Sequence, residues 1–140
     1  MKRGKIAEEV GMSLPSVSDR IRKLEERSVI TGYQAVVDPR KLGYDICAFI
    51  RVVVDGSSHF HEFVANAIAE RDIQEIHSVT GDGSHILRIA ARDTASLERL
   101  LSLIQSWPGV HGTSTSLVLT SFKDSRSVRA APQLMMTQES

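Results

Sequence analysis

The first segment of the chain carries apolar residues at helical spacing. A short helix is predicted over residues 5–10, where one face collects the apolar side chains Ile6, Ala7 and Val10. Gly11 is suited to end that helix, because glycine tolerates a positive φ. A second helix is predicted to start at Ser13, whose hydroxyl makes a good N-cap, with Pro15 in its first turn.

This second helix combines an apolar stripe with a polar outer face. The stripe recurs at steps of three, four and three residues and consists of Leu14, Val17, Ile21 and Leu24. The side chains that point the other way are Pro15, Ser16, Asp19, Arg22 and Lys23. Two helices joined by a glycine-containing turn, the second with basic residues on its outer face, are typical of a helix-turn-helix.

The rest of the chain alternates between strands and helices. Residues 29–38 are β-rich, and we predict a strand there that leaves the first module as a linker. Residues 46–54 are almost continuously apolar, as in a strand buried on both faces. A helix is predicted from the stripe Phe60, Phe63, Val64, Ala67 and Ile68. Another helix, which Asp93 would cap, is predicted from Leu97, Leu100, Leu101 and Ile104.

Three further strands complete the pattern. Strands are predicted at 73–79 and 86–91, on either side of a Gly- and Asp-containing turn at 80–84, and a last strand at 110–122. The order β-α-β-β-α-β is the ferredoxin-like arrangement, and the fold class is α+β. A single sheet with both helices on one side leaves its other face uncovered. Since residues 46–54 offer apolar side chains on both sides, we expect a second copy to cover that face in a homodimer.

Composition and charge change this picture little. The chain has 140 residues, 41% of them hydrophobic and 24% charged, and its 17 basic residues balance 17 acidic ones. Residues 1–30 carry a surplus of only two basic side chains, so one copy would bind DNA weakly and several copies would be needed. The single Cys47 lies in an apolar run and is expected to be a buried thiol. No apolar stretch is long enough to span a bilayer and no signal peptide is recognisable, so we expect a cytoplasmic protein without a membrane partner.

Across roughly residues 5–124 the chain resembles the Lrp/AsnC (feast/famine) family of transcriptional regulators. The resemblance rests on several segments, which are Ile6-Ala7-Glu8-Glu9-Val10-Gly11-Met12-Ser13, Val17-Ser18-Asp19-Arg20-Ile21-Arg22-Lys23-Leu24-Glu25, Val29-Ile30-Thr31-Gly32-Tyr33, Asp38-Pro39, Leu42-Gly43, Ser78-Val79-Thr80-Gly81-Asp82, Pro108-Gly109-Val110 and Thr113-Ser114-Thr115. It implies a winged helix-turn-helix followed by a ferredoxin-like, RAM-type regulatory domain. It also implies dimers formed through the sheets, and tetramers or octamers of those dimers. A further helix normally precedes Ile6 in this family, and residues 1–4 are too short to form it, so we expect a truncated DNA-binding unit.

The resemblance also implies an amino-acid effector, bound between dimers near the turn at 80–84 and the last strand. The corresponding residues are Gly81, Asp82, Gly83, Ser84, His85, Thr113 and Thr115. Backbone N–H groups of the glycine loop would bind the ligand carboxylate, Asp82 or Ser84 its ammonium, and His85 would pair with a carboxylate or make the site pH-sensitive. The family favours Gly-Asp-Tyr-Asp-Tyr here, so this loop lacks both aromatics. An ordinary hairpin turn is the alternative interpretation.

DNA contacts are expected from the second helix, whose start would enter the major groove and whose guanidinium groups suit phosphates and guanine. The candidate residues are Ser13, Pro15, Ser16, Ser18, Asp19, Arg20, Arg22 and Lys23. The alternative is a solvated face held by the pairs Asp19–Lys23 and Arg22–Glu26.

Neither metal chemistry nor catalysis is indicated. The five histidines show no metal-binding helical spacing, and no nucleophile stands in a catalytic motif, so we predict no enzyme and no cofactor beyond an amino-acid effector. The predicted domains are a partial helix-turn-helix (1–30), a linker strand (31–44), an effector-binding and oligomerisation domain (45–124) and a flexible tail (125–140). The predicted function is a sequence-specific DNA-binding transcriptional regulator whose assembly and double-stranded DNA binding respond to a small effector. The alternative is a stand-alone sensing and oligomerisation module that no longer binds DNA.

Overall fold

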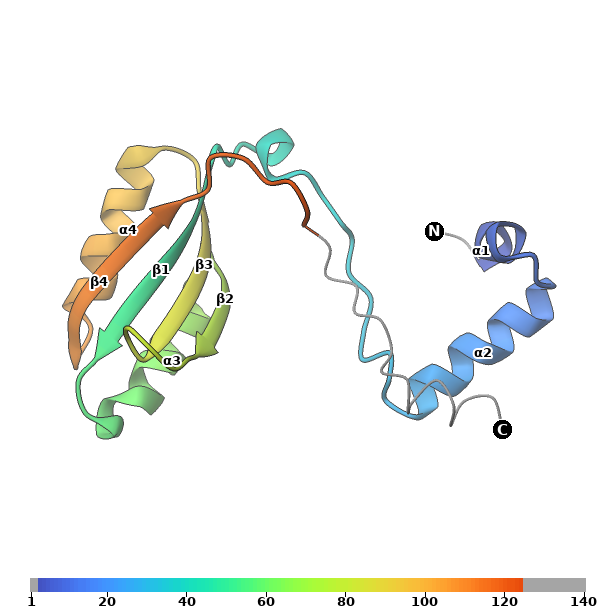
Figure 1. The fold of residues 1–140 in the computed structure, drawn as a ribbon, viewed down its shortest axis with the longest axis horizontal. Coiled ribbons are helices and arrows are strands. Elements are labelled where there is room, and N and C mark those ends of the chain that lie inside the picture. Colours follow the sequence, from blue (N-terminus) through green and yellow to red (C-terminus); the bar gives the residue numbers. More distant parts are fainter. Residues whose placement is uncertain (1–2, 125–140) are drawn as a thin grey trace. The chain divides into compact units, whose positions relative to one another are not determined.

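A computed structural model describes residues 3–124, and the predicted tail at 125–140 lies outside the described residues. The chain divides into two compact units, one ending at Val37 and the other starting at Asp38 (Figure 1). None of the helices in the described part of the chain is long and apolar enough to cross a membrane.

The first unit contains the two predicted helices, α1 (Arg3–Val10) and α2 (Leu14–Glu26). Gly11 ends α1 with φ 68°, and the N–H of Met12 reaches back to the carbonyl of Ala7 at 3.0 Å, which closes a Schellman-type cap. The N-cap of α2 is Ser13, whose hydroxyl accepts from the N–H of Ser16 at 3.3 Å. The sequence prediction for this helix pair is confirmed.

The apolar core of this unit is small. Only Ala7 and Val17 are buried among its described residues, with 6% and 4% of their surface exposed. Leu14, predicted to lie on the buried stripe, is the first residue of α2 and is 50% exposed. Helices this short gain most of their stability from packing. Because few side chains of this unit are buried, packing within the unit stabilises the two helices only weakly.

The linker strand predicted within 31–44 is wrong. Residues 31–38 form no ladder, and Pro39–Leu42 is a short 3-10 helix capped by Asp38. The β-rich composition misled the prediction because a strand is stabilised only by a neighbour that accepts its backbone hydrogen bonds. Within the described chain no neighbour pairs with this segment, and Val36 is fully exposed.

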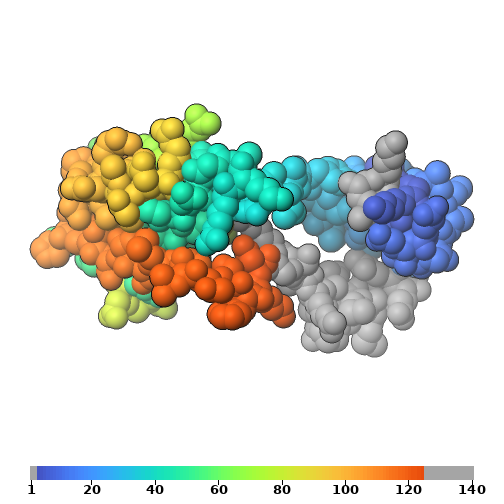
Figure 2. Space-filling model, turned by 90° about the horizontal axis from the view of Figure 1, so that it is seen from above, coloured from blue at the N-terminus to red at the C-terminus, as the bar shows by residue number. Residues whose placement is uncertain are grey.

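The second unit has the predicted β-α-β-β-α-β order. Its main elements are β1 (Ile46–Val54), α3 (Phe60–Ala69), β2 (Ile73–Ser78), β3 (His85–Ala91), α4 (Thr94–Ser106) and β4 (Val110–Leu117). The strands form one antiparallel sheet in the order β2-β3-β1-β4, and both helices lie on one side of it (Figure 1). This is the ferredoxin-like arrangement that the sequence predicts, and β4 is an edge strand that Figure 2 shows in orange at the surface.

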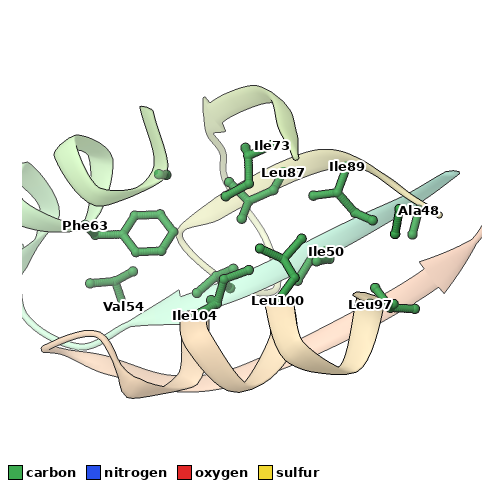
Figure 3. Packing of buried hydrophobic residues seen from close by; sticks show 13 residues of the cluster. Ala48, Ile50, Val54, Phe63, Ile73, Leu87, Ile89, Leu97, Leu100 and Ile104 are labelled. Atoms are coloured by element: carbon green, nitrogen blue, oxygen red, sulfur yellow. The ribbon is translucent and has the colours of Figure 1, made fainter. Parts of the chain in front are cut away.

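The core lies between the sheet and the two helices. Alternate residues of β1 point into it, and the cluster in Figure 3 joins them to side chains of α3, β2, β3 and α4, namely Ala48, Ile50, Val52, Val54, Phe63, Ala67, Ile73, Leu87, Ile89, Ala91, Leu97, Leu100 and Ile104. The helical stripes predicted from the sequence supply the buried members of α3 and α4. Ile68 is the exception on α3, because it is 70% exposed.

Two further expectations need correction. The last strand ends at Leu117, because the N–H of Val118 makes the final bond to the carbonyl of Cys47 and β1 offers no partner beyond its own start. Cys47 is half-buried and free, since it falls on the side of β1 that faces away from the helices.

Candidate functional site

The outer face of α2 carries the candidate DNA contacts. Pro15 and Ser16 are exposed at the helix start, and the hydroxyls of Ser13 and Ser16 are joined by a 2.8 Å hydrogen bond. Ser18 is half-buried on the side of the helix. The start of α2 is thus accessible to a groove, although part of its hydrogen-bonding capacity is used locally.

Two of the basic residues on α2 are paired within the helix. Arg22 bonds to Asp19 at 2.7 Å and to Glu26 at 3.0 Å, and Lys23 lies 3.1 Å from Asp19. Hydrogen bonds from Arg22 and Lys23 lower the pKa of Asp19, so this carboxylate stays charged. The ion pairs Asp19–Lys23 and Arg22–Glu26, which the alternative interpretation of a solvated helix face predicts, are therefore formed. Asp19 acts here as an anchor for its basic neighbours, since a carboxylate would repel phosphate.

Arg20 differs from its neighbours. Among the described residues it is in no salt bridge, and it is exposed. At about 100° per residue, Ser16, Arg20 and Lys23 fall on one ridge of α2 with Arg27, which caps the helix end and is also exposed. Arg27 was not among the DNA contacts predicted from the sequence, which end at Lys23. The periodicity of the ridge would have revealed it.

The C-terminal half of α2 is tied to the rest of its unit through Glu25. This carboxylate lies 3.6 Å from Arg3 of α1 and accepts a 2.5 Å hydrogen bond from the hydroxyl of Tyr33. The same hydrogen bond raises the pKa of Tyr33. Polar contacts thus supplement the small core that holds α1 and α2 together.

The candidate effector loop joins β2 to β3. Gly81 and Gly83 adopt φ of 95° and 91°, and a Cβ on Gly83 would come within 3.0 Å of the Val52 carbonyl, so only glycine fits there without strain. No hydrogen bond among the described residues uses the N–H groups of Gly81, Asp82 or Gly83. The carbonyl of Asp82 accepts a 3.4 Å bond from Arg51.

Ser84 fastens this loop to the central strand. Its N–H donates to the carbonyl of Val52 at 2.9 Å, and its hydroxyl accepts from the N–H of Val54 at 3.0 Å and donates to Val52 at 3.3 Å. The hydroxyl also lies 2.8 Å from Nδ1 of His85. Since these contacts occupy the hydroxyl, the Asp82 carboxylate is the better placed of the two predicted ammonium acceptors.

His85 faces the core and not the solvent. The residue is 2% exposed, its ring lies 4.9 Å from those of both Phe60 and Phe63, and burial lowers its pKa. The alternation of β3 causes this, because His85 pairs with Val52 and shares its helix-covered side. His85 therefore exposes too little surface for the expected direct contact with a ligand. Instead its contact with the Ser84 hydroxyl helps to hold the loop in place.

The predicted threonines lie across β1 from the loop. Thr113 pairs with Val52 and Thr115 with Ile50, so both are on the helix-covered side of the edge strand and half-buried. The hydroxyl of Thr113 accepts from Gln105 of α4 at 3.0 Å. The structure thus brings the loop and Thr113 to the same end of the sheet, with β1 between them. Within residues 3–124 no group of three or more His, Cys, Asp or Glu is placed to hold a metal ion.

The face of the sheet opposite the helices is uncovered in a single chain. We call it the open face, and its central residues are Cys47, Phe49, Arg51, Val53, Ile86, Arg88 and Ala90. Phe49 is 40% exposed and Val53 is 42% exposed. The charge of Arg88 within this patch is partly neutralised, because Arg88 forms an ion pair with Glu75 of β2.

Comparison with known proteins gives consistent matches over both units. Residues 47–128 match the Lrp/AsnC ligand binding domain, and residues 2–31 match a winged helix-turn-helix DNA-binding family. The HTH-type transcriptional regulator FL11 of Pyrococcus horikoshii is 36% identical over 119 residues, which cover 85% of this chain and 78% of the relative.

Solved structures agree with these matches. The feast or famine regulatory protein of M. tuberculosis, complexed with L-methionine, superposes with a TM-score of 0.78 at 27% identity and covers 91% of this chain and 86% of its own. A transcriptional regulator from Neisseria meningitidis, also complexed with L-methionine, superposes with a TM-score of 0.84 over 92% of this chain and 85% of its own. Its identity of 22% supports the fold alone.

The buried His85 predicts a pH-dependent stability. Because its pKa is lowered by burial, the unfolded chain binds a proton more readily than the folded chain as the pH falls below the ordinary histidine value of 6.5. The free energy of unfolding should therefore drop between about pH 7.5 and about pH 5.5. His85→Gln should reduce that drop, whereas His111→Gln, at an exposed position on β4, should not.

Urea denaturation followed through Trp107, which packs 5.7 Å from Phe63, measures this effect. Equal pH dependence in the native chain and in His85→Gln would show that the buried ring is not the titrating group.

Proposed function

The chain belongs to the Lrp/AsnC family of transcriptional regulators, and from this premise we propose that it is a sequence-specific DNA-binding regulator whose assembly and DNA binding respond to a small effector, an amino acid. The observation that carries the proposal is the joining, in one chain, of a helix-turn-helix with an exposed basic ridge and a sheet with an open apolar face. The proposed function combines DNA contact, self-assembly and effector binding.

The ridge formed by Ser16, Arg20, Lys23 and Arg27 is the proposed DNA contact surface. Arg20 is exposed and in no salt bridge within the described chain, so it can meet a phosphate without first breaking an ion pair. Arg22 and Lys23 must exchange a carboxylate for a phosphate, which reduces their net gain. The exposed Pro15 and Ser16 lie at the helix start, the part of a recognition helix that meets base edges.

This assignment predicts different salt dependences for two arginines. The probe is a DNA duplex that this chain selects from a random library, and the measured quantity is the slope of log affinity against log salt concentration. In Arg20→Ala this slope should flatten by about 0.9 for each phosphate contact that is lost. Arg22→Ala should flatten it less, because Asp19 and Glu26 already engage that side chain. Lys123→Ala, an exposed charge outside the first unit, is the matched control. An unchanged slope in Arg20→Ala would remove this residue from the interface.

The open face is the proposed contact with a second copy. Its apolar residues lie on the central strands β1 and β3, and the Arg88–Glu75 pair balances one of its two arginines, while Arg51 donates to the carbonyl of Asp82. A second copy can place the same patch against it around a twofold axis, which is how isologous dimers form. Two linked helix-turn-helix units then bind with an effective concentration that one weak unit lacks.

A charge placed in the open face should separate the copies. Phe49→Asp should convert the dimer into monomers in light scattering at micromolar concentration and should weaken binding to the selected duplex by about a hundredfold or more. Ile68→Asp is the control, because Ile68 is similarly apolar and 70% exposed but lies on α3, on the other side of the sheet. A native chain that is monomeric under the same conditions would refute the assembly.

The loop between β2 and β3 is the proposed effector contact. The N–H groups of Gly81, Asp82 and Gly83 have no acceptor within the described chain, and successive N–H groups around left-handed glycines suit a carboxylate. The exposed Asp82 carboxylate suits an ammonium group. Thr113 and Thr115 lie at or near the same end of the sheet and would line the site from β4. The M. tuberculosis relative, 27% identical, is complexed with L-methionine, which supports an amino acid as the ligand class.

An amino-acid effector should stabilise the native chain. A ligand present at about 100 times its dissociation constant adds about 2.7 kcal/mol, which a thermal-shift screen of the common amino acids resolves. The shift should vanish in Asp82→Asn and remain in Asp124→Asn, which removes an exposed charge elsewhere. If no amino acid raises the melting temperature, the effector belongs to another chemical class or the loop is an ordinary turn.

A second candidate function, a sensing and oligomerisation module without DNA binding, is favoured by one observation. The first unit buries only Ala7 and Val17 among its described residues, so its two helices are held weakly. The salt titration above separates the two candidates. A chain of the second kind would select no duplex at all.

A further inference from the structure

A polar groove lies at the end of the sheet opposite to the effector loop. It has a volume of about 460 Å³ and is lined by residues from the start of β1, the turn between α3 and β2, the end of β3 and the side of α4, namely Tyr44, Glu70, Arg71, Asp72, Arg92, Ser96, Arg99, Leu100 and Leu103. All of these residues belong to the second unit. Leu100, which Figure 3 shows on α4 pointing toward the sheet, is 4% exposed and belongs to the hydrophobic core beneath the groove.

The groove gathers three guanidinium groups from separate elements. Arg71 follows α3, Arg92 follows β3 and Arg99 is on α4. None of them is in a salt bridge among the described residues, and Arg99 donates a 3.0 Å hydrogen bond to the hydroxyl of Ser96. The three guanidinium groups thus remain available for hydrogen bonds, although Glu70 and Asp72 line the same groove and offset part of their charge. An anion that bridges the arginines gains from all three.

The surroundings restrict what kind of anion fits. Glu70 and Asp72 line the same groove and can accept hydrogen bonds from hydroxyl or ammonium groups, while Tyr44 and Leu103 offer apolar contact. The neighbouring Asp93 accepts the 2.8 Å bond from the N–H of Ser96 that caps α4. That bond and the charges of Arg99 and Arg92 lower the pKa of Asp93, so this carboxylate also offsets part of the positive charge beside the groove. A small organic molecule with oxyanion groups at one end suits the groove, because the oxyanion groups can contact the arginines while the rest of the molecule contacts the carboxylates and the apolar side chains.

We propose that this groove is a binding site for a small oxyanion-bearing metabolite, an organic phosphate or dicarboxylate, held by Arg71, Arg92 and Arg99. The site is separate from the effector loop. The loop joins the end of β2 to the start of β3, whereas the groove lies at the start of β2 and the end of β3, roughly 20 Å away along seven residues of β3 at about 3.3 Å each. The proposal goes beyond the proposed function and does not require the chain to bind DNA or an amino acid.

Titration of the full chain by nuclear magnetic resonance tests the site directly, because the side-chain Nε–H signals of the arginines report contact with an anion. The probes are pyrophosphate, succinate and sodium chloride at matched ionic strength. We expect saturable shifts of the Arg92 and Arg99 signals with a dissociation constant of about 1 mM or tighter for pyrophosphate, succinate or both, and no saturation with chloride. The tighter of the two binding probes identifies the oxyanion class.

Variants link the signal to the groove. Arg92→Gln combined with Arg99→Gln should weaken the tighter probe about tenfold or more, and Arg99→Lys, which keeps the charge but removes the planar fork, should weaken it less. Lys123→Gln removes one exposed positive charge outside the groove and should leave the affinity unchanged. Shifts that follow ionic strength alone, or an affinity that survives the double variant, would overturn the proposal. These arginines are exposed, so loss of folding does not confuse the result.

Discussion

The structure depends on strand β1, which pairs with a neighbour on each edge and contributes side chains to both faces of the sheet, the helix-covered face and the open face. It bonds to β3 on one side and to β4 on the other, and its alternate side chains form the centre of the core. The side chains that alternate with them, those of Cys47, Phe49, Arg51 and Val53, lie on the face that nothing covers in the single chain. Burying the apolar side chains of this second face would stabilise the strand, so the proposed self-association would use the same nine residues that organise the core.

Val52 shows how this strand also positions the candidate site. Its carbonyl accepts from the backbone and the hydroxyl of Ser84, its close approach requires glycine at position 83, and Thr113 pairs with it from the opposite edge. The loop that carries Asp82 is therefore fixed by backbone contacts with the central strand, and its chemistry can vary without loss of its position. The position of this hairpin therefore does not depend on aromatic side chains in the loop.

Local signals in the sequence were sufficient for most of the fold. The Ser13 cap, the stripes of α3 and α4 and the glycine turn between β2 and β3 depend on neighbours a few residues away, and all were predicted. What the sequence could not show depends on partners distant in the chain. The segment at 31–38 has strand composition but no strand to pair with, His85 turns inward because of its register with Val52, and the groove arginines meet only after folding. Composition also does not reveal that Arg22 is occupied while Arg20 is free of ion pairs within the described chain.

The pairing within α2 gives the multivalent mechanism its physical reason. The chain has no net charge, and on the recognition helix Asp19 and Glu26 engage Arg22 while Asp19 also engages Lys23. Each helix-turn-helix unit thus presents few unengaged cations, and non-specific attraction of one copy to DNA is weak. Such a unit binds firmly only where a rigid partner holds a second copy at the spacing of two half-sites. In the proposed assembly the open face of the sheet would recruit that partner, and the weakness of the single unit would make occupancy of DNA sensitive to whatever controls assembly.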